Sequence, residues 1–328
     1  MVEHLGVTEP LDAGDVVAAL PLKLLRTLYH RRRMPEWLYK LALMTMPRSW
    51  YPEPQLYILR KCFDDHEIEL VHRTNDTIGR EAWLFGYYDR LVLKFLREIA
   101  AGLKGTATHP IAYYDIGANV GNHAAYLADL FDQVYCFEPN PEALELLRVN
   151  LAPFRHAEIF PIGLSNRDAE LNLAPGGANN LGAAHIVTTH GREAAVRQIA
   201  VRNGDQLVAE STLVPPMVMK IDVEGHEPEV IAGLEQTIRR HAPVIAIEIW
   251  ERTLGRVAPL RDLLGSVGYR SFRMTGLSRV RQLASFQNRL VVTPYAFDTP
   301  CENALAVPPQ YWDSLQHLLG DSPAGADN

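Results

Sequence analysis

The sequence predicts an α/β fold built on a doubly wound, mostly parallel sheet. Three observations lead to this expectation. Short apolar segments alternate with helical ones between residues 113 and 249, which is typical of parallel sheets. A glycine-punctuated turn follows the first apolar segment, and the second ends in an acidic residue, Glu138. Both features are common where strands end beside a ligand in such sheets.

We expect the parallel strands at residues 113–117, 133–138, 157–162, 216–222 and 243–249. The connecting helices are expected at 121–131, 140–151 and 226–240, and an amphipathic helix at 80–101 precedes them. A further helix at 258–266 leads to strands near 268–274 and 288–293. These last two strands should pair as an antiparallel hairpin at the edge of the sheet.

The chain divides into three expected parts. Residues 1–79 should form an N-terminal extension, helical up to about residue 50 and then mixed, with prolines breaking its helices. Residues 80–300 should form the main domain, with a Gly-rich insertion near 163–202 lying over the strand ends. Residues 301–328, rich in Pro, Ala and polar side chains, should form a partly disordered tail.

The composition is that of a soluble globular protein, with 47% hydrophobic and 22% charged residues. A net charge of −7 argues against a nucleic-acid binder. The three cysteines are far apart and odd in number, so neither a disulfide framework nor a Cys-rich metal site is expected. No apolar run is long enough to span a membrane and the N-terminus does not resemble a secretory signal, so we expect a cytoplasmic protein.

One segment is strongly basic. Between Pro21 and Trp50, seven Lys and Arg residues stand against a single acid, Glu36, with apolar residues interleaved. The favoured interpretation is a helical cap that packs on the main domain and solvates its charges. A basic amphipathic surface that meets an anionic membrane or an acidic partner is the alternative.

The turn after the first strand has the form D-x-G-x-x-x-G, from Asp115 to Gly121. A dinucleotide fingerprint would need G-x-G-x-x-G, but Asn119 and Asn122 occupy its second and third glycine positions. The carboxylate of Asp115 would repel a pyrophosphate and would suit a cationic group. Gly117 and Gly121 would allow the backbone to approach a ligand closely.

Glu138 lies roughly 20 residues past this turn, where a nucleoside-binding βαβ unit contacts a ribose. A ligand with a ribose and positive charge but no phosphate fits these residues better than NAD does. S-adenosylmethionine, with its ammonium and sulfonium groups, is such a ligand. The alternative is an ordinary βα turn that binds a different ligand.

The fourth strand ends in a cluster of charged residues at Lys220, Asp222 and Glu224, before the turn at Gly225. Ligands bind outside the carboxyl ends of strands in open α/β sheets, so these side chains are candidates for catalysis. Lys220 and Asp222 can form an ion pair if they share a strand face. The alternative is that the acids only stabilise the start of the next helix.

Two further residues are candidates for the chemistry. Glu248 lies in the otherwise apolar fifth strand and is costly to bury without a partner, so it is a candidate base or substrate ligand; a structural pair with an arginine is equally plausible. His226 adjoins the acidic cluster and titrates near neutral pH. His123, His185 and His190 are weaker candidates. Motifs of zinc hydrolases, α/β-hydrolases and P-loop proteins are absent from the sequence.

Taken together, these motifs resemble the FkbM-type family of S-adenosylmethionine-dependent methyltransferases. The resemblance covers about residues 80–250 and rests on 115–121, Phe137-Glu138-Pro139-Asn140-Pro141, Gly163-Leu164-Ser165, 220–227 and Ile247-Glu248. It implies a Rossmann-like fold of the class I methyltransferase type and an O-methyltransferase that acts on a sugar or other small metabolite. The region before residue 80 and the insertion show no family motif.

The resemblance also implies roles for individual residues. Gly117 to Gly121 should face the methionine part, Glu138 the ribose, and Pro139, Asn140, Leu164 and Ser165 the adenine side. The predicted cofactor-binding residues are Asp115, Gly117, Asn119, Gly121, Asn122, Glu138, Pro139, Asn140, Leu164, Ser165 and Asp222. The predicted catalytic residues are Lys220, Asp222, Glu224, His226 and Glu248, with no metal.

Since a sulfonium already activates the methyl group, the protein would mainly align the acceptor hydroxyl and remove its proton. A metal held by Asp222 and Glu224 is a less favoured option. The alternative function is a non-catalytic module that binds a membrane or a protein partner through its basic N-terminal segment. The acceptor and the oligomeric state are left undetermined by the sequence.

Overall fold

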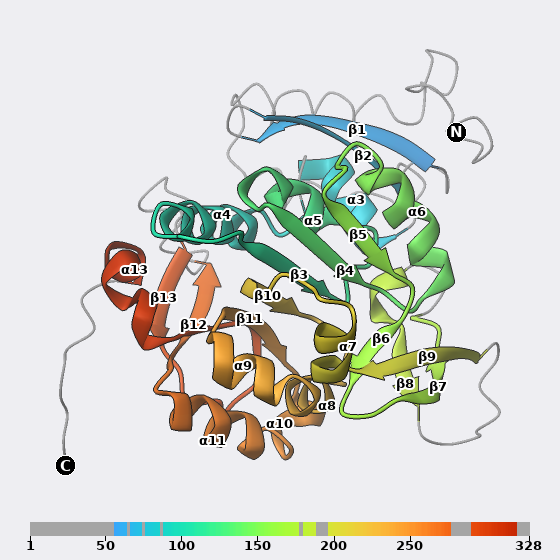
Figure 1. The fold of residues 1–328 in the computed structure, drawn as a ribbon. Helices are drawn as coiled ribbons and strands as arrows, with labels where there is room; N and C mark the ends of the chain where they lie inside the picture. Colours follow the sequence, from blue (N-terminus) through green and yellow to red (C-terminus); the bar gives the residue numbers. More distant parts are fainter. Residues whose placement is uncertain are drawn as a thin grey trace.

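The computed structural model describes residues 56–63, 66–73, 76–85, 88–176, 180–187, 196–276 and 290–319. Their centre is an eight-stranded sheet in the order β13-β12-β14-β11-β10-β3-β4-β5 (Figure 1). Five neighbouring strands are parallel: β3 (Ala112–Ile116), β4 (Gln133–Phe137), β5 (Ala157–Phe160), β10 (Pro216–Ile221) and β11 (Val244–Ile249). The predicted doubly wound α/β fold is confirmed.

Three antiparallel strands complete the sheet at one side: β12 (Arg270–Gly276), β13 (Leu290–Pro294) and β14 (Cys301–Val307). The hairpin of β12 and β13 is the predicted edge hairpin. The expectation of a tail from residue 301 is wrong for β14, which pairs with both β12 and β11 inside the sheet. Its run of Ala304, Leu305 and Ala306 is fully buried, and this short apolar run between polar and Pro-containing segments gave too weak a strand pattern.

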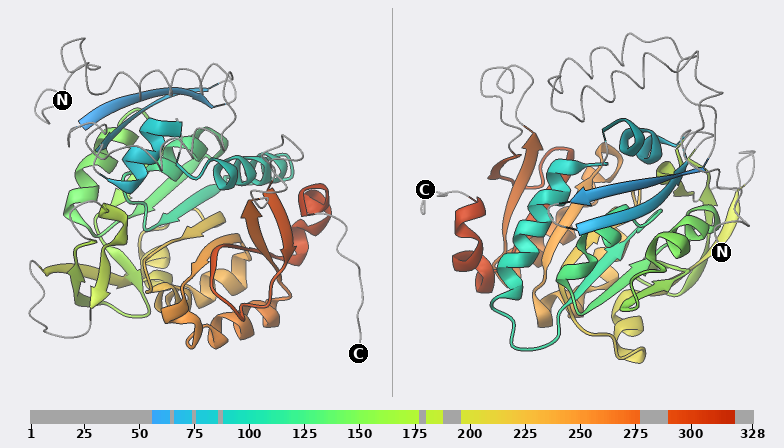
Figure 2. Two further views of the ribbon diagram at one scale, coloured as in Figure 1. Left: turned by 180° about the vertical axis from the view of Figure 1, so that it is seen from behind. Right: turned by 90° about the horizontal axis from the view of Figure 1, so that it is seen from above.

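Helices cover both faces of the sheet, as Figures 1 and 2 show. Neighbouring β3 residues point to opposite faces, so Tyr113 packs in one apolar core and Tyr114 in the other. The Tyr113 core is formed with α4 (Arg90–Lys104), α5 (Asn122–Leu127), α6 (Pro141–Leu151) and α13 (Trp312–Leu319). The Tyr114 core is formed with α7 (Gly204–Glu210), α8 (Glu227–Gly233), α9 (Glu235–His241) and α11 (Ala258–Val267). The remaining helical turns are η4 (Ala128–Leu130), η5 (Leu181–Ala183), η6 (Pro309–Tyr311) and α10 (Glu251–Leu254).

The predicted helix at 80–101 is interrupted. The structure has α3 (Thr77–Phe85) and then α4, and Asp89 between them adopts a left-handed conformation with φ 51°. This conformation is incompatible with a continuous helix and is uncommon for a non-glycine residue. The break directs Tyr88 and Asp89 to the edge of the main sheet. The predicted helix at 226–240 is likewise divided, between α8 and α9 at Leu234.

An antiparallel hairpin, β1 (Leu56–Phe63) and β2 (His66–Arg73), lies against the main domain beside α6 (Figures 1 and 2). Buried Asn150 of α6 fixes it. The Asn150 amide accepts the Val71 N–H at 2.6 Å and donates to the Val71 carbonyl at 3.1 Å and the Val120 carbonyl at 2.7 Å. One side chain therefore links the hairpin to the glycine turn. The helices expected before residue 50, with their basic segment, lie outside the described residues.

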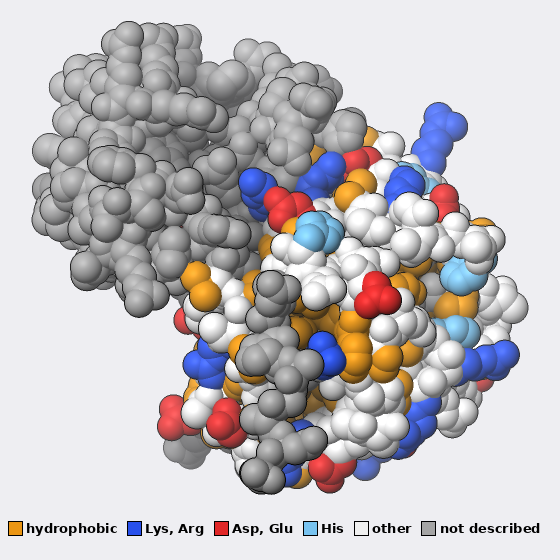
Figure 3. Space-filling view, turned by 90° about the vertical axis from the view of Figure 1, so that its left-hand side faces the viewer, with side chains coloured by type: hydrophobic (Ala, Val, Ile, Leu, Met, Phe, Trp, Pro, Cys, Tyr) orange, Lys and Arg blue, Asp and Glu red, His pale blue; other side chains and the backbone are white. Residues whose placement is uncertain are grey.

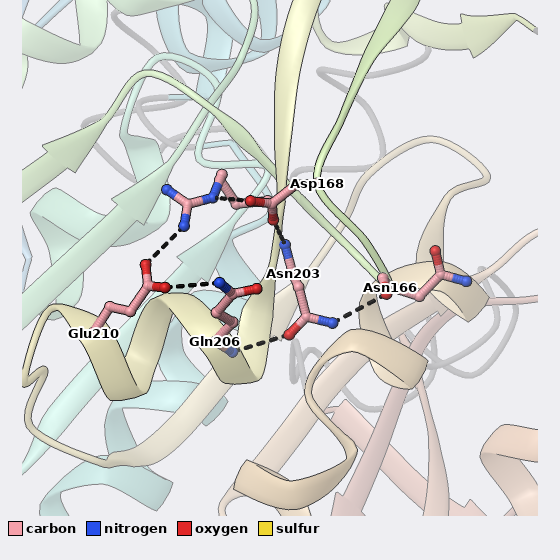
Figure 4. Close-up of polar contacts among 6 residues, drawn as sticks. Asn166, Asp168, Asn203, Gln206 and Glu210 are labelled. Carbon is pink, nitrogen blue, oxygen red and sulfur yellow. Dashed lines mark hydrogen bonds and ion pairs between the residues drawn. The ribbon is translucent and has the colours of Figure 1, made fainter.

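The predicted insertion forms a second, four-stranded sheet in the order β6-β9-β7-β8. Its strands are β6 (Gly163–Ser165), β7 (Ala169–Ala174), β8 (His185–Val187) and β9 (Arg197–Asn203). Figure 4 shows the polar contacts that join this sheet to α7. Asn203 caps α7 by accepting the Gln206 N–H at 2.9 Å, and it donates to the Asn166 carbonyl at 3.0 Å (Figure 4). Its own N–H donates to Asp168 at 2.8 Å within the insertion, and Arg202 of β9 donates to Glu210 of α7 at 2.8 Å, which joins the insertion to that helix.

Candidate functional site

A cavity of about 430 Å³ lies at the carboxyl ends of β3, β4, β10 and β11. This is the edge of an open α/β sheet where ligands bind. The insertion and the α3–α4 connection complete its walls, through residues such as Leu173, Leu181, Ile186 and Tyr88. All five predicted catalytic residues line it: Lys220, Asp222, Glu224, His226 and Glu248. Eight of the predicted cofactor-binding residues do so too: Gly117, Asn119, Asn122, Glu138, Pro139, Asn140, Leu164 and Asp222.

The glycine turn forms the floor between β3 and β10. Gly117 has φ +82°, and a Cβ there would lie 1.8 Å from the backbone oxygen of Asp222, so only glycine fits. The Asp222 N–H donates to the Ile116 carbonyl at 3.0 Å. These contacts bring the turn and the acidic cluster together. Gly121 does not line the cavity; a Cβ on it would lie 2.7 Å from Leu147, so it serves packing against α6.

Glu138 is fixed by backbone donors on both sides. Its Oε2 accepts the Asn119 N–H at 2.8 Å, and its Oε1 accepts the Asn140 N–H at 2.7 Å. Burial raises the pKa of Glu138 to about 7, although these two hydrogen bonds act in the opposite direction. Each carboxylate oxygen keeps a further acceptor site. The residue is thus rigidly held and able to accept two vicinal hydroxyl groups.

Asp115 does not line the cavity, in contrast to the expectation that it meets the ligand directly. It is 1% exposed and lies behind the wall, where Lys220 and His123 are its nearest cationic neighbours in electrostatic effect. Burial raises the pKa of Asp115, and both neighbours act to lower it. Its carboxylate therefore affects the site indirectly, by raising the pKa of Lys220, which lines the cavity.

Lys220 and Asp222 form an ion pair, Nζ to Oδ2, at 2.8 Å. Burial acts to lower the pKa of Lys220, but Asp222, Asp115 and Glu248 outweigh it and raise that pKa above its ordinary value. The lysine therefore stays protonated and cannot serve as a base at neutral pH. Its ammonium holds the Asp222 carboxylate at the cavity, as the shared strand face suggested.

Glu248 and Glu224 line the cavity together with Asp222. Burial, followed by the charge of Asp222, raises the pKa of Glu248 to about 9, while Lys220 acts to lower it. Glu224 has φ +53° and pairs with Arg252 at 2.9 Å. Burial raises the pKa of Glu224 as well. An arginine partner was the alternative expectation for Glu248. In the structure the arginine, Arg252, pairs with Glu224 instead.

His226 lines the cavity, but both its ring nitrogens have neighbours. Nε2 lies 2.9 Å from the Ser165 hydroxyl, and Nδ1 lies 3.6 Å from Glu229. Burial lowers the pKa of His226, so the imidazole is neutral at pH 7. Ser165 itself is 2% exposed and lies outside the cavity lining, so it positions His226 where adenine contact had been predicted.

Several lining residues carry no motif and escaped the sequence analysis, namely Tyr88, Asp89, Trp250, Glu302 and Asn303. Tyr88 is brought in by the left-handed Asp89, whose carboxylate lies 3.8 Å from His123 Nε2. Burial, then Asp222 and Asp89, raise the pKa of Tyr88 above its ordinary value. Trp250 lies two residues after Glu248, and this spacing was the one signal in the sequence that could have identified it. Of the other histidines, His123 lines the cavity, His185 does not, and His190 lies outside the described residues.

The cavity offers no evident metal site. Within the described ranges, no group of three or more His, Cys, Asp or Glu side chains is arranged to hold a metal ion.

None of the helices in the described ranges has both the length and the apolar character needed to span a bilayer. On the face shown in Figure 3, described acidic and basic side chains are interspersed among apolar ones, without a continuous basic surface.

Comparison with known proteins was made by sequence and by structure. Residues 115–271 match the family model of the methyltransferase FkbM domain. Hexuronic acid methyltransferase AglP of Haloferax volcanii is 33% identical over 130 residues, which are 38% of this chain and 51% of AglP. The 2-O-methyltransferase NoeI of Sinorhizobium fredii is 28% identical over 146 residues, which are 38% of this chain and 58% of NoeI. The chain thus spans about half the length of these relatives.

Among solved structures, the methyltransferase FkbM from Methylobacillus flagellatus aligns with a TM-score of 0.40 and 17% identity. The alignment covers 62% of this chain and 45% of that one.

Proposed function

Because the chain belongs to the FkbM family of methyltransferases, we propose that it transfers a methyl group from S-adenosylmethionine to a hydroxyl oxygen of a sugar or other small metabolite. The observation that carries the proposal is that one cavity contains both the rigidly held Glu138 and the Lys220–Asp222 pair. The first suits a ribose, and the second suits the reacting end of the ligand. The names of AglP and NoeI support a sugar hydroxyl as acceptor.

The residues present fit this cofactor. Glu138 can accept both ribose hydroxyls while its backbone donors keep it in place. The close approach at Gly117 leaves room for the amino-acid part beside Asn119 and Asn122. The surrounding carboxylates favour a ligand with net positive charge over a pyrophosphate. When bound, S-adenosylmethionine supplies a methyl carbon that its sulfonium has already activated.

The chain's own residues then have two tasks, which are alignment and proton removal. We assign Asp222 as the proton acceptor, because Lys220 occupies only its Oδ2 and leaves Oδ1 for the acceptor hydroxyl. Glu248, which holds its proton at neutral pH, can orient the acceptor by hydrogen bonds. Lys220 can stabilise the negative charge that develops on the oxygen. Glu224 pairs with Arg252, and His226 is hydrogen-bonded to Ser165. We therefore assign both residues a structural role in the site.

We further propose that residues 80–319 form the methyltransferase domain and that the small-molecule acceptor enters past the α3–α4 connection. A cytoplasmic location is part of the proposal and is supported by two free, buried cysteines among the described residues, Cys136 and Cys301.

Two measurements test the function. Calorimetry of the full chain should detect S-adenosylmethionine at micromolar affinity, and a non-catalytic module would not need to bind it. Transfer of label from the methyl-labelled cofactor into a mixture of sugars and glycosides should then yield a methylated product, which mass spectrometry identifies. Cofactor binding without transfer to any hydroxyl would contradict the proposed reaction.

A further inference from the structure

The order of the strands divides the cavity into two halves. Glu138, at the end of β4, lies on one side of β10, and β11 and β14 lie on the other. If the cofactor lies across β3 and β4 with its methyl group towards Asp222, the acceptor must lie over β10, β11 and β14. This acceptor half is lined by Tyr88, Asp222, Glu224, Glu248, Trp250 and Glu302.

Among the described residues, the Lys and Arg side chains next to this half are Lys220 and Arg252, and each has an acidic partner. Lys220 binds Asp222 at 2.8 Å, and Arg252 binds Glu224 at 2.9 Å. Arg252 also lies over the Trp250 ring, 4.8 Å from its centroid. His123 lies 3.8 Å from Asp89. An acceptor with a negative charge would therefore have to displace an existing ion pair in order to find a counter-ion.

Two acidic side chains line the acceptor half without a cationic partner among the described residues: Glu248, which holds its proton at neutral pH, and the exposed Glu302. Within the described part of the chain, neither Glu248 nor Glu302 has a hydrogen-bonded or ion-paired partner. Glu248 is partly buried and lines the cavity with Trp250 and the Lys220–Asp222 pair. The indole nitrogen of Trp250 is buried and also has no hydrogen-bond partner among the described residues. Buried polar groups in this state are usually satisfied by a ligand or by water.

We propose that the acceptor is a sugar with no carboxylate or phosphate beside the methylated hydroxyl, and that the acceptor half rejects uronic acids; this rests on the proposed methyltransferase function. Hydroxyl groups can donate to the Glu302 carboxylate, and Glu248, which holds its proton at neutral pH, can donate to a hydroxyl oxygen or accept from a hydroxyl. Trp250 and Tyr88 offer aromatic surface to the apolar face of a sugar ring. A uronate carboxylate would lie next to the carboxylates of Asp222 and Glu224, with no free Lys or Arg among the described residues of this half, which is strongly unfavourable.

The test compares acceptors that differ only at C6. The full chain is supplied with methyl-labelled S-adenosylmethionine and with p-nitrophenyl glucoside or glucuronide, and in parallel with the galactoside or galacturonide. We expect kcat/KM for the neutral member of each productive pair to exceed that for the uronate by at least ten-fold. Equal rates, or a faster uronate, would overturn the inference while leaving the methyltransferase function standing.

Two charge-reversal variants test whether the preference for the neutral sugar arises in the acceptor half. Glu302→Lys adds an uncommitted cation to the acceptor half, so the preference for the neutral sugar should fall at least three-fold. Asp262→Lys makes the same change of charge at a side chain that is 77% exposed on α11 and is not part of the lining, so the preference should not change. An equal fall in both variants would mean that net charge, and not the acceptor half, sets the preference, and the inference would fail.

Calorimetry separates failure of the inference from failure of the function. Loss of both cofactor binding and transfer would contradict the methyltransferase itself. Cofactor binding with no transfer to any of the four glycosides, but with transfer to an acidic sugar, would overturn the inference alone. Cofactor binding with no transfer to any sugar would overturn the sugar acceptor, and the inference with it.

Discussion

At the scale of single residues, most charged side chains of the site are held by a partner on the protein itself. Lys220 holds Asp222, Arg252 holds Glu224, and backbone N–H groups hold Glu138. Each of these side chains is fixed before a ligand arrives, which lowers the cost of ordering the site. The residues without such partners, above all Glu248, are the ones left to contact the acceptor.

Asp222→Asn tests the assigned proton acceptor. The asparagine keeps the size of the side chain and can still accept from Lys220, but it cannot take a proton. We expect kcat to fall by about 10²–10⁴-fold, the usual contribution of a general base, with cofactor affinity changed far less. Single-turnover transfer and calorimetry measure the two effects. Turnover near that of the unmodified chain would remove Asp222 from the proton transfer.

Tyr88→Phe tests a residue that the sequence did not reveal. Tyr88 lines the cavity, and burial and the charge of Asp222 raise the pKa of its hydroxyl. We expect kcat/KM for the acceptor to fall by about three- to ten-fold, the value of one hydrogen bond of about 0.5–1.5 kcal/mol, with cofactor affinity unchanged. Tyr114→Phe is the control, because that hydroxyl donates to the Val214 carbonyl away from the cavity. An equal loss in both variants would mean that Tyr88 acts only through stability.

At the scale of elements, the parallel strands and the motifs at their ends were predictable, because buried strands are continuous apolar runs and their ends carry charge. The site residues on those ends followed from the same pattern. Two features were not predictable. Asp89 breaks an amphipathic pattern that is otherwise helical, and only tertiary contacts such as its pairing with His123 favour that conformation. The strand β14 is short, alanine-rich and distant in sequence from its partners.

Leu305→Ala tests the placement of β14. Leu305 is fully buried between β12 and β11, so its truncation should lower the free energy of unfolding by about 2–5 kcal/mol. Glu302→Ala, at an exposed position of the same strand, should change it by less than about 0.5 kcal/mol. Urea unfolding of the full chain measures both. Two equally small effects would be expected of a peripheral tail and would contradict an interior strand.

At the scale of the whole molecule, the buried acids make stability depend on pH with a definite sign. Burial raises the pKa of Glu138 and of Glu227 to about 7, and that of Glu248 to about 9, all from an ordinary value of 4.5. Between 4.5 and these values the folded chain binds more protons than the unfolded chain, so stability falls as pH rises. We therefore expect the Tm of the ligand-free protein to decrease from pH 5 to pH 8, because the unfolded chain ionises these acids at lower pH than the folded chain does. Glu248→Gln removes one titrating group and should flatten the decrease above pH 7, whereas Asp262→Asn, at an exposed carboxylate, should leave its slope unchanged. S-adenosylmethionine should reduce the decrease too, because its positive charge favours the ionised acids around it. Thermal unfolding across this pH range measures all four curves, and a Tm that rises steadily towards pH 8 in the unmodified chain would contradict an acidic cavity that holds its protons.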